Sequence, residues 1–180
     1  MSKPSAWWVA VVASGVVTGC NEGSSVPLAG SAPVASGSQL PACETFSTNL
    51  TLLDRMSQPT NTFNVGEDIF PNMRVTNNAP YPVTMQPAYS CAMIVFEVFS
   101  QTTKLWSNDT IMCSVGVPER TYAPYESVYY SQALDSFPGP PSWPSGAYTV
   151  KARVGLVKDN QGQWVDCGAT LDKQASFNIL

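Results

Sequence analysis

Residues 148–156, YTVKARVGL, alternate between apolar and polar side chains. Successive side chains of a β-strand point to opposite faces, so a period of two collects the apolar side chains on one side. The polar face carries Thr149, Lys151 and Arg153. The predicted inward face consists of Tyr148, Val150, Ala152, Val154 and Leu156. The stretch therefore predicts a strand with one buried and one solvated side, as in a packed antiparallel sheet.

The same period of two recurs through the remainder of residues 41–180. In segment 92–99, Ile94, Phe96 and Val98 are predicted to face inward, and Glu97 is predicted to mark the wetter face. Turn-forming residues separate the strands, and 158–162 (KDNQG) predicts a hairpin loop. We expect further strands at 49–53, 69–75, 125–132, 163–167 and 176–180, with a short one at 104–107. About seven to nine short strands without a long amphipathic helix predict an all-β fold, an immunoglobulin-like antiparallel β-sandwich.

Composition limits the chemistry that such a domain can perform. The chain has a net charge of −4 and no basic cluster, so we expect no nucleic-acid partner. Histidine is absent, which removes the commonest general base and zinc ligand, and the five cysteines form no CxxC pair. No two carboxylates have a spacing that forces them into one site. The sequence therefore predicts a non-catalytic protein without a metal site or cofactor, and an enzyme is the weakest of the functional classes weighed.

The first nineteen residues have the organisation of a secretory signal peptide. Lys3 supplies a positive start, and residues 6–17 (AWWVAVVASGVV) form an apolar run too short to span a bilayer, which takes about 20 residues. The alternative, a buried core helix, is disfavoured by Gly15 and the β-branched valines. We therefore expect residues 1–19 to direct export.

Val17-Thr18-Gly19-Cys20 resembles the bacterial lipobox. The resemblance implies cleavage before Cys20 and lipidation of its thiol, so the chain would be anchored in the cell envelope on the extracytoplasmic side, in the outer membrane if the host has one. Two or three acyl chains hold a protein at a membrane essentially permanently. Residues 20–40, rich in Ser, Gly, Ala and Pro, predict a flexible tether; the alternative is an edge strand over 26–34. Residues 41–180 are then the sandwich domain.

The four other cysteines make an even set, and disulfides are expected in an exported domain. Three pairings are possible. We favour Cys91–Cys113, because these positions bracket neighbouring strands, and Cys43–Cys167, because that bond would tie the start of the domain to its last hairpin. The alternative is four buried free thiols.

The order of features between Phe63 and Leu156 resembles the BsuPI-type intracellular proteinase inhibitor domain. The resemblance covers about half the chain and implies an immunoglobulin-like sandwich that inhibits a bacterial serine protease; we transfer no reactive-site residue from it. Its pieces are Arg74-Val75-Thr76-Asn77, Pro82-Val83-Thr84-Met85, Ile94-Val95-Phe96-Glu97-Val98-Phe99, Lys104-Leu105-Trp106-Ser107, Ala123-Pro124-Tyr125-Glu126-Ser127 (where the family tends to have Pro-Gly-Glu) and Pro144-Ser145-Gly146-Ala147-Tyr148-Thr149-Val150.

Aromatic and proline residues are the candidates for contact with a partner. Exposed Trp or Tyr can anchor a protein or stack on a sugar, and prolines reduce the entropy lost when a loop binds. The candidate contact residues are Trp143, Pro140 and Pro141, from the loop 138–144, and Tyr125. The sequence thus predicts a lipid-anchored envelope binding module that restrains a protein such as a serine protease; the alternative is a carbohydrate- or peptidoglycan-binding module.

Overall fold

The computed structural model describes residues 39–87, 92–109, 118–134 and 143–180. These residues belong to one compact unit, 37–180, which is built from three sheets. The elements are η1 (Ala42–Glu44), β1 (Phe46–Leu53), β2 (Thr62–Phe63), β3 (Phe70–Asn77), β4 (Val83–Gln86), β5 (Ile94–Ser100), β6 (Thr103–Ser107), β7 (Arg120–Tyr122), β8 (Ser127–Ser131), β9 (Gly146–Val154), β10 (Leu156–Lys158), β11 (Trp164–Asp166), α1 (Gly168–Leu171) and β12 (Lys173–Ile179).

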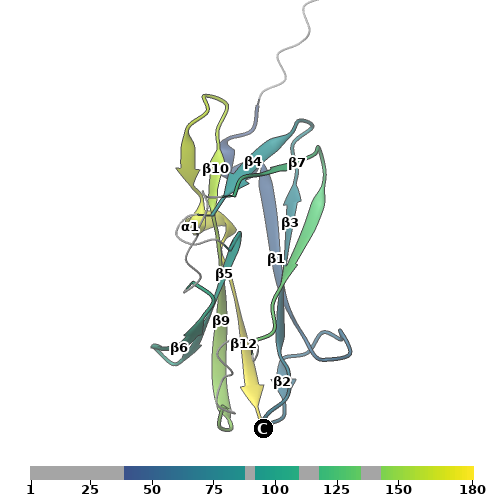
Figure 1. Cartoon of the computed structure of the whole chain (residues 1–180), viewed down its shortest axis with the longest axis vertical. Helices are drawn as coiled ribbons and strands as arrows, with labels where there is room; N and C mark the ends of the chain where they lie inside the picture. Colours follow the sequence, from purple (N-terminus) through teal and green to yellow (C-terminus); the bar gives the residue numbers. More distant parts are fainter. Residues whose placement is uncertain (1–38, 88–91, 110–117, 135–142) are drawn as a thin grey trace, which may run out of the picture. The chain divides into compact units, whose positions relative to one another are not determined.

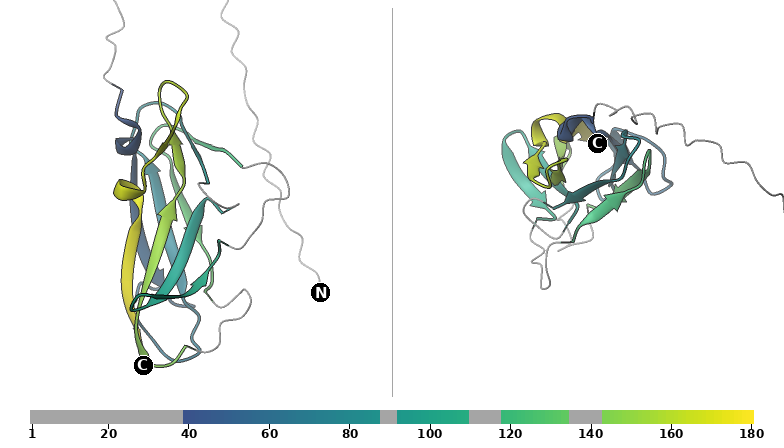
Figure 2. Two further views of the ribbon diagram at one scale, coloured as in Figure 1. Left: turned by 90° about the vertical axis from the view of Figure 1, so that its left-hand side faces the viewer. Right: turned by 90° about the horizontal axis from the view of Figure 1, so that it is seen from above.

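Two of the sheets form the layers of a sandwich. The five-stranded sheet has the order β2-β12-β9-β5-β6 and the three-stranded sheet the order β1-β3-β8. Figures 1 and 2 show them facing each other, with the four-stranded sheet β11-β10-β4-β7 at the upper end. All strand pairs are antiparallel except the short parallel pair β2–β12. The predicted fold class, an immunoglobulin-like antiparallel β-sandwich, is confirmed.

The core lies between the layers where the period of two predicted it. Met73 and Val75 of β3, Val98 of β5 and Val150 of β9 are completely buried, and Phe177 of β12 is 1% exposed. Burying a side chain of this size contributes roughly 1.5–3 kcal/mol. The apolar faces of sequence-distant strands therefore close on one another to make the domain.

The predicted strand 148–156 is interrupted at Gly155, where β9 ends and β10 begins. β9 belongs to the five-stranded sheet and β10 to the four-stranded sheet, so the chain changes sheet at this glycine. A Cβ on Gly155 would lie 1.8 Å from the carbonyl oxygen of Gln86. The break shifts the alternation by one residue: Val157 is completely buried, whereas Leu156 is only partly buried. The prediction that Leu156 shares the inward face is therefore wrong.

The described residues form twelve strands, more than the seven to nine expected. The additional strands β2, β4, β7 and β10 have only two to four residues each, which gives a period of two little length over which to be recognised. The hairpin loop predicted at 158–162 is present between β10 and β11: Asp159 accepts the backbone N–H groups of Gln161 and Gln163, and Gly162 has a φ of 80°.

Glu97 is buried, contrary to the prediction that it marks the wetter face. Its side chain is 7% exposed and lies between cations of the neighbouring strands. The Nζ of Lys104 on β6 is 3.1 Å from Oε1 of Glu97, and Nη1 of Arg153 on β9 is 3.7 Å from the same oxygen. The strand parity was predicted correctly, but the long side chains of two adjacent strands cover the carboxylate.

Candidate functional site

Five residues singled out in the sequence lie outside the described residues. They are Cys20, Cys91, Cys113, Pro140 and Pro141. The predicted lipidation at Cys20 and the predicted Cys91–Cys113 bond therefore stay predictions.

The second predicted disulfide is confirmed. The sulfur atoms of Cys43 and Cys167 are bonded across a sequence separation of 124 residues. Cys43 lies in η1 and Cys167 directly precedes α1, so the bond joins the start of the domain to its last hairpin.

Trp143, a predicted contact residue, is buried in the core and exposes little of its side chain to a partner. Its side chain is 8% exposed and stacks on the ring of Tyr148, with 5.7 Å between ring centroids. The hydroxyl of Tyr148 donates a hydrogen bond to the carbonyl oxygen of Pro144, 2.6 Å away. Aromatic rings in such contact favour burial over exposure. The sequence could not distinguish this indole from an exposed one, because its neighbours come from other strands.

Tyr125 is exposed, as a contact residue must be. Its side chain is 66% exposed and its backbone has a φ of 61°. It lies in the four residues between β7 and β8, Ala123–Glu126, which we name the Tyr125 turn. A proline at the second position and a positive φ at the third match a type II turn, which favours glycine at the third position. At this position Tyr125 adopts the left-handed backbone conformation, which is sterically unfavourable for a residue that carries a Cβ atom.

The Tyr125 turn is held rigidly from both ends. The carboxylate of Glu126 accepts the N–H of Ala123 at 2.8 Å and pairs with the guanidinium of Arg120 at 3.0 Å. Asn77, which is completely buried, donates its side-chain amide to the carbonyl oxygens of Tyr122 and Ala123. The turn therefore presents Tyr125 on a fixed backbone and not on a loop that must be ordered on binding.

Two hydrogen-bonded tyrosines support the strands on either side of this turn. The hydroxyl groups of Tyr122 on β7 and Tyr130 on β8 are 2.5 Å apart. Burial raises the pKa of both phenols above their ordinary value, and for Tyr122 the hydrogen bond to Tyr130 raises its pKa further. Tyr122 also packs edge-on against Phe46 of β1 at 5.0 Å. This pair ties the end of β7 to the three-stranded sheet.

The outer face of the three-stranded sheet carries polar side chains in rows. Asn49 on β1 lies opposite Arg74 on β3, and Arg74 lies opposite Tyr129 on β8. Tyr129 is 61% exposed. The flanking rows contain only serine, threonine and asparagine: Ser47, Thr76 and Ser127 in one row, and Thr51, Asn72 and Ser131 in the other. Alternation in the sequence indicates that these side chains point outward. Which of them lie opposite one another depends on the strand register, which only the assembled sheet fixes.

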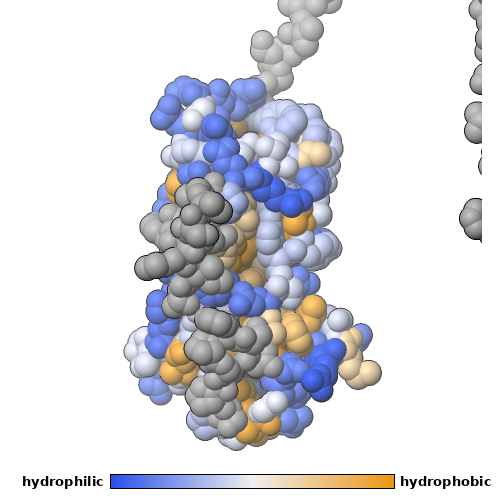
Figure 3. Space-filling model, in the orientation of Figure 1, coloured by the Kyte–Doolittle hydropathy of each residue, from blue (hydrophilic) through white to orange (hydrophobic). Residues whose placement is uncertain are grey.

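Apolar surface is divided into separate areas on the face shown in Figure 3. The large hydrophobic side chains that are exposed come from different elements: Met56, Val65, Leu105, Tyr125, Tyr129 and Leu180. Of these, Tyr125 and Tyr129 follow one another on a single turn and strand, so the β7–β8 connection and β8 form the candidate binding surface.

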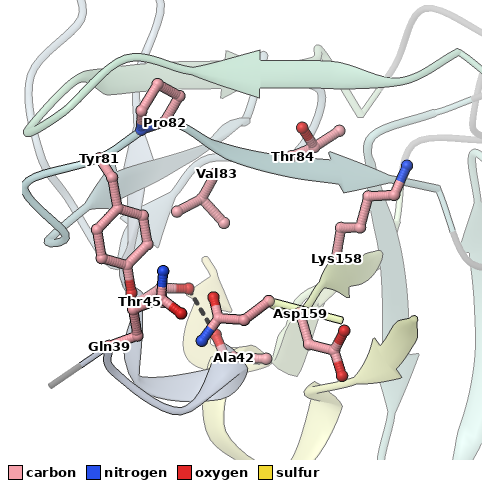
Figure 4. A pocket seen from close by; sticks show the side chains of 10 residues that line it. Gln39, Ala42, Thr45, Tyr81, Pro82, Val83, Thr84, Lys158 and Asp159 are labelled. Atoms are coloured by element: carbon pink, nitrogen blue, oxygen red, sulfur yellow. Dashed lines mark hydrogen bonds between the residues drawn. The ribbon is translucent and has the colours of Figure 1, made fainter. Parts of the chain in front are cut away.

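A hollow of about 350 Å³ lies where the described chain begins. Figure 4 shows Tyr81, Thr45, Lys158 and Asp159 around it. These polar groups already serve the fold: the hydroxyl of Tyr81 accepts the N–H of Leu40, Asp159 caps its hairpin, and Thr45 donates to the carbonyl oxygen of Ala42. We therefore assign no ligand to the hollow.

Within the part of the chain that the structure describes, no three His, Cys, Asp or Glu side chains lie close enough together to hold a metal ion. The same residues contain no helix with the length and apolarity needed to cross a bilayer.

Comparisons with known proteins give weak structural likenesses alone. No protein-family model matches the chain, and no curated protein matches it. A β-glucosidase of Erythrobacter marinus is 8% identical over 75% of this chain and 15% of its own, with a TM-score of 0.40; a β-glucosidase of Listeria innocua is 9% identical over 74% and 16%, also at 0.40. The DNA-bound alkylpurine DNA glycosylase AlkC of Pseudomonas fluorescens is 12% identical over 76% and 30%, at 0.37. The chain spans less than a third of each of these proteins, and likenesses at this level carry no argument about function.

Proposed function

We propose that the chain is a non-catalytic, lipid-anchored binding module of the cell envelope that contacts a protein partner through the Tyr125 turn. The observation that carries the proposal is Tyr125 itself, a largely exposed aromatic residue in a left-handed backbone conformation. Residues in strained backbone regions concentrate at functional sites, because the surrounding structure must hold them there. Tyrosine is among the residues most enriched at the energetic centres of protein interfaces.

Two further features support a location outside the cytoplasm. The lipobox-like Val17-Thr18-Gly19-Cys20 and the preceding apolar run are typical of exported lipoproteins. The Cys43–Cys167 disulfide is of a kind that persists in oxidising compartments and is rare in the cytosol. Both agree with a domain that meets its partner at the cell surface or in the periplasm.

The specific form of the proposal is inhibition of an extracytoplasmic serine protease. Subtilisin-like and chymotrypsin-like proteases would be assayed with the full chain and with two variants, Tyr125→Gly and Tyr125→Phe. Inhibition by the wild type and by Tyr125→Phe, with loss in Tyr125→Gly, is expected, because phenylalanine keeps the aromatic ring and glycine removes it. Absence of inhibition at micromolar protein would remove the inhibitor form of the proposal.

The second candidate function is binding of a glycan such as peptidoglycan. It is favoured by the outer face of the three-stranded sheet, where Tyr129 stands among serine, threonine and asparagine side chains. Pull-down on insoluble glycans would test it, with Tyr129→Ala as the variant expected to lose binding and Tyr125→Gly as the control expected to keep it. Retention by the glycan that does not change in Tyr129→Ala would contradict this function.

A further inference from the structure

Among the residues that the structure describes, β8 is an edge strand whose outer side pairs with no other strand. It pairs with β3 alone, and the hydrogen bond from Asn77 N–H to the carbonyl oxygen of Glu126 fixes which residues face that partner. In an antiparallel ladder the bonded pairs alternate with unbonded ones. The backbone groups of Val128 and Tyr130 therefore point toward β3, and those of Ser127, Tyr129 and Ser131 point away from it.

These three outward residues are also exposed. Their side chains are accessible to solvent, and no hydrogen bond joins their backbone N–H or C=O groups to another residue that the structure describes. The edge thus presents three donors and three acceptors, spaced two residues apart, that match the spacing of an extended chain.

The other sheet edges among the described residues carry features that discourage pairing. β2, β7 and β11 have two or three residues each, and β6 contains Lys104 and pairs with β5 through an irregular register. The far side of β1 is covered near its ends: Thr48 donates to the carbonyl oxygen of Leu171, and Thr60 donates to that of Leu52. β8, with the sequence SVYYS, has no charge, no proline and no bulge. Natural proteins protect sheet edges with such devices, and their absence marks a pairing site.

We propose that the free edge of β8 binds an extended peptide segment of the protein partner as an additional strand. This inference rests on the proposed protein-binding function and specifies how the partner is held. Main-chain hydrogen bonds of such an added strand provide affinity, and side chains that alternate between the two faces provide specificity.

The side chains around β8 define the peptide sequence that fits. On the inner face, Val128 and Tyr130 are half-buried against the core, so the peptide residues beside them are apolar. On the outer face, the peptide residue opposite Tyr129 lies two strand spacings, about 10 Å, from Arg74. A glutamate side chain at that position and the arginine side chain together bridge this distance. Arg74 is exposed and forms no ion pair with another described residue. The preferred segment is therefore apolar–glutamate–apolar at its centre.

The test uses the full chain and two synthetic peptides of about nine residues, the length that covers β8 with margins. Threonine alternates with valine in both peptides; the central threonine position carries glutamate in one and lysine in the other. Amide hydrogen exchange is measured by NMR with and without peptide. The expected result is new protection at Ser127, Tyr129 and Ser131 alone, with the lysine peptide binding about threefold more weakly than the glutamate peptide.

Matched variants distinguish the contribution of a backbone hydrogen bond to peptide binding from that of the side chain at the same position. Ser131→Pro removes an outward N–H, while Ser131→Ala keeps it; proline is tolerated on an edge strand when its nitrogen faces away from the ladder. Tyr129→Pro repeats the test at a second position. We expect about tenfold weaker peptide binding in either proline variant, little change in Ser131→Ala, and loss of the glutamate preference in Arg74→Gln.

Several outcomes would overturn the inference. They are equal binding by Ser131→Pro and Ser131→Ala, protection at another edge, and no protection with either peptide at millimolar concentration. Concentration-dependent dimerisation that Ser131→Pro abolishes would also overturn it, since the edge would then bind a second copy of the chain. If the edge fails while protease inhibition still depends on Tyr125, the proposed function stands without this inference.

Discussion

At the scale of single residues, Tyr125 is proposed to serve binding at a cost to the stability of the domain. Glycine adopts a positive φ without the steric cost that a tyrosine Cβ incurs. We expect Tyr125→Gly to stabilise the domain by about 1 kcal/mol and to raise Tm by a few degrees. The matched control is Tyr129→Gly, an exposed tyrosine within a strand, where glycine is destabilising by about 0.5–1 kcal/mol. Thermal unfolding in which both variants lose stability equally would show that the turn holds no strain at Tyr125.

The Tyr122–Tyr130 pair predicts a stability that falls at alkaline pH. Burial raises the pKa of both phenols in the folded state, so above pH 10, the ordinary value, the unfolded chain releases protons that the folded chain retains. Stability is therefore present below pH 10 and is lost as the pH rises above it. Urea midpoints measured between about pH 8 and pH 11 should fall less steeply in the Tyr122→Phe/Tyr130→Phe double variant. The exposed Tyr129→Phe should keep the wild-type slope, and an unchanged slope in the double variant would contradict the assignment.

At the scale of elements, the break between β9 and β10 depends on Gly155. A Cβ there would lie 1.8 Å from a backbone oxygen of Gln86, so the β4–β10 pair would have to move apart. We expect Gly155→Ala to destabilise the domain by about 1–3 kcal/mol in chemical denaturation. In the control Gly168→Ala, the nearest atoms are carboxylate oxygens at 3.2 Å, so a shift of a few tenths of an ångström accommodates the Cβ. A loss in Gly155→Ala no larger than in this control would mean that the strands accommodate a side chain.

At the scale of the whole domain, the Cys43–Cys167 disulfide closes a long loop. It links residues 124 apart, so its removal frees most of the domain in the unfolded state. The double variant Cys43→Ser/Cys167→Ser is expected to lose about 2–5 kcal/mol. Under oxidising conditions, urea unfolding should give a lower midpoint for the variant than for the wild type. A midpoint equal to that of the oxidised wild type would show that the bond adds nothing to stability.

Much of the fold and part of the candidate site are readable from the sequence. Alternation placed Met73, Val75, Val98 and Val150 in the core, and the spacing of the cysteines led to the Cys43–Cys167 pair. These features follow from patterns that are local in the sequence. They were predicted correctly because a strand with one apolar face can bury that face in only one orientation. Tyr125 was named a candidate contact residue but placed at the start of a predicted strand over 125–132, whereas it lies in the turn before β8 with a positive φ.

Tertiary structure alone decided the features that depend on neighbours from other strands. Trp143 is buried by the ring of Tyr148, Glu97 is enclosed by Lys104 and Arg153, and Leu156 leaves the inward face because the chain changes sheet at Gly155. The free edge of β8 likewise exists only through the order of strands in the sheet. The sequence by itself thus determined which side chains seek burial, because that preference belongs to the residue; packing decided which of them reach it, because burial and pairing are set by non-local contacts.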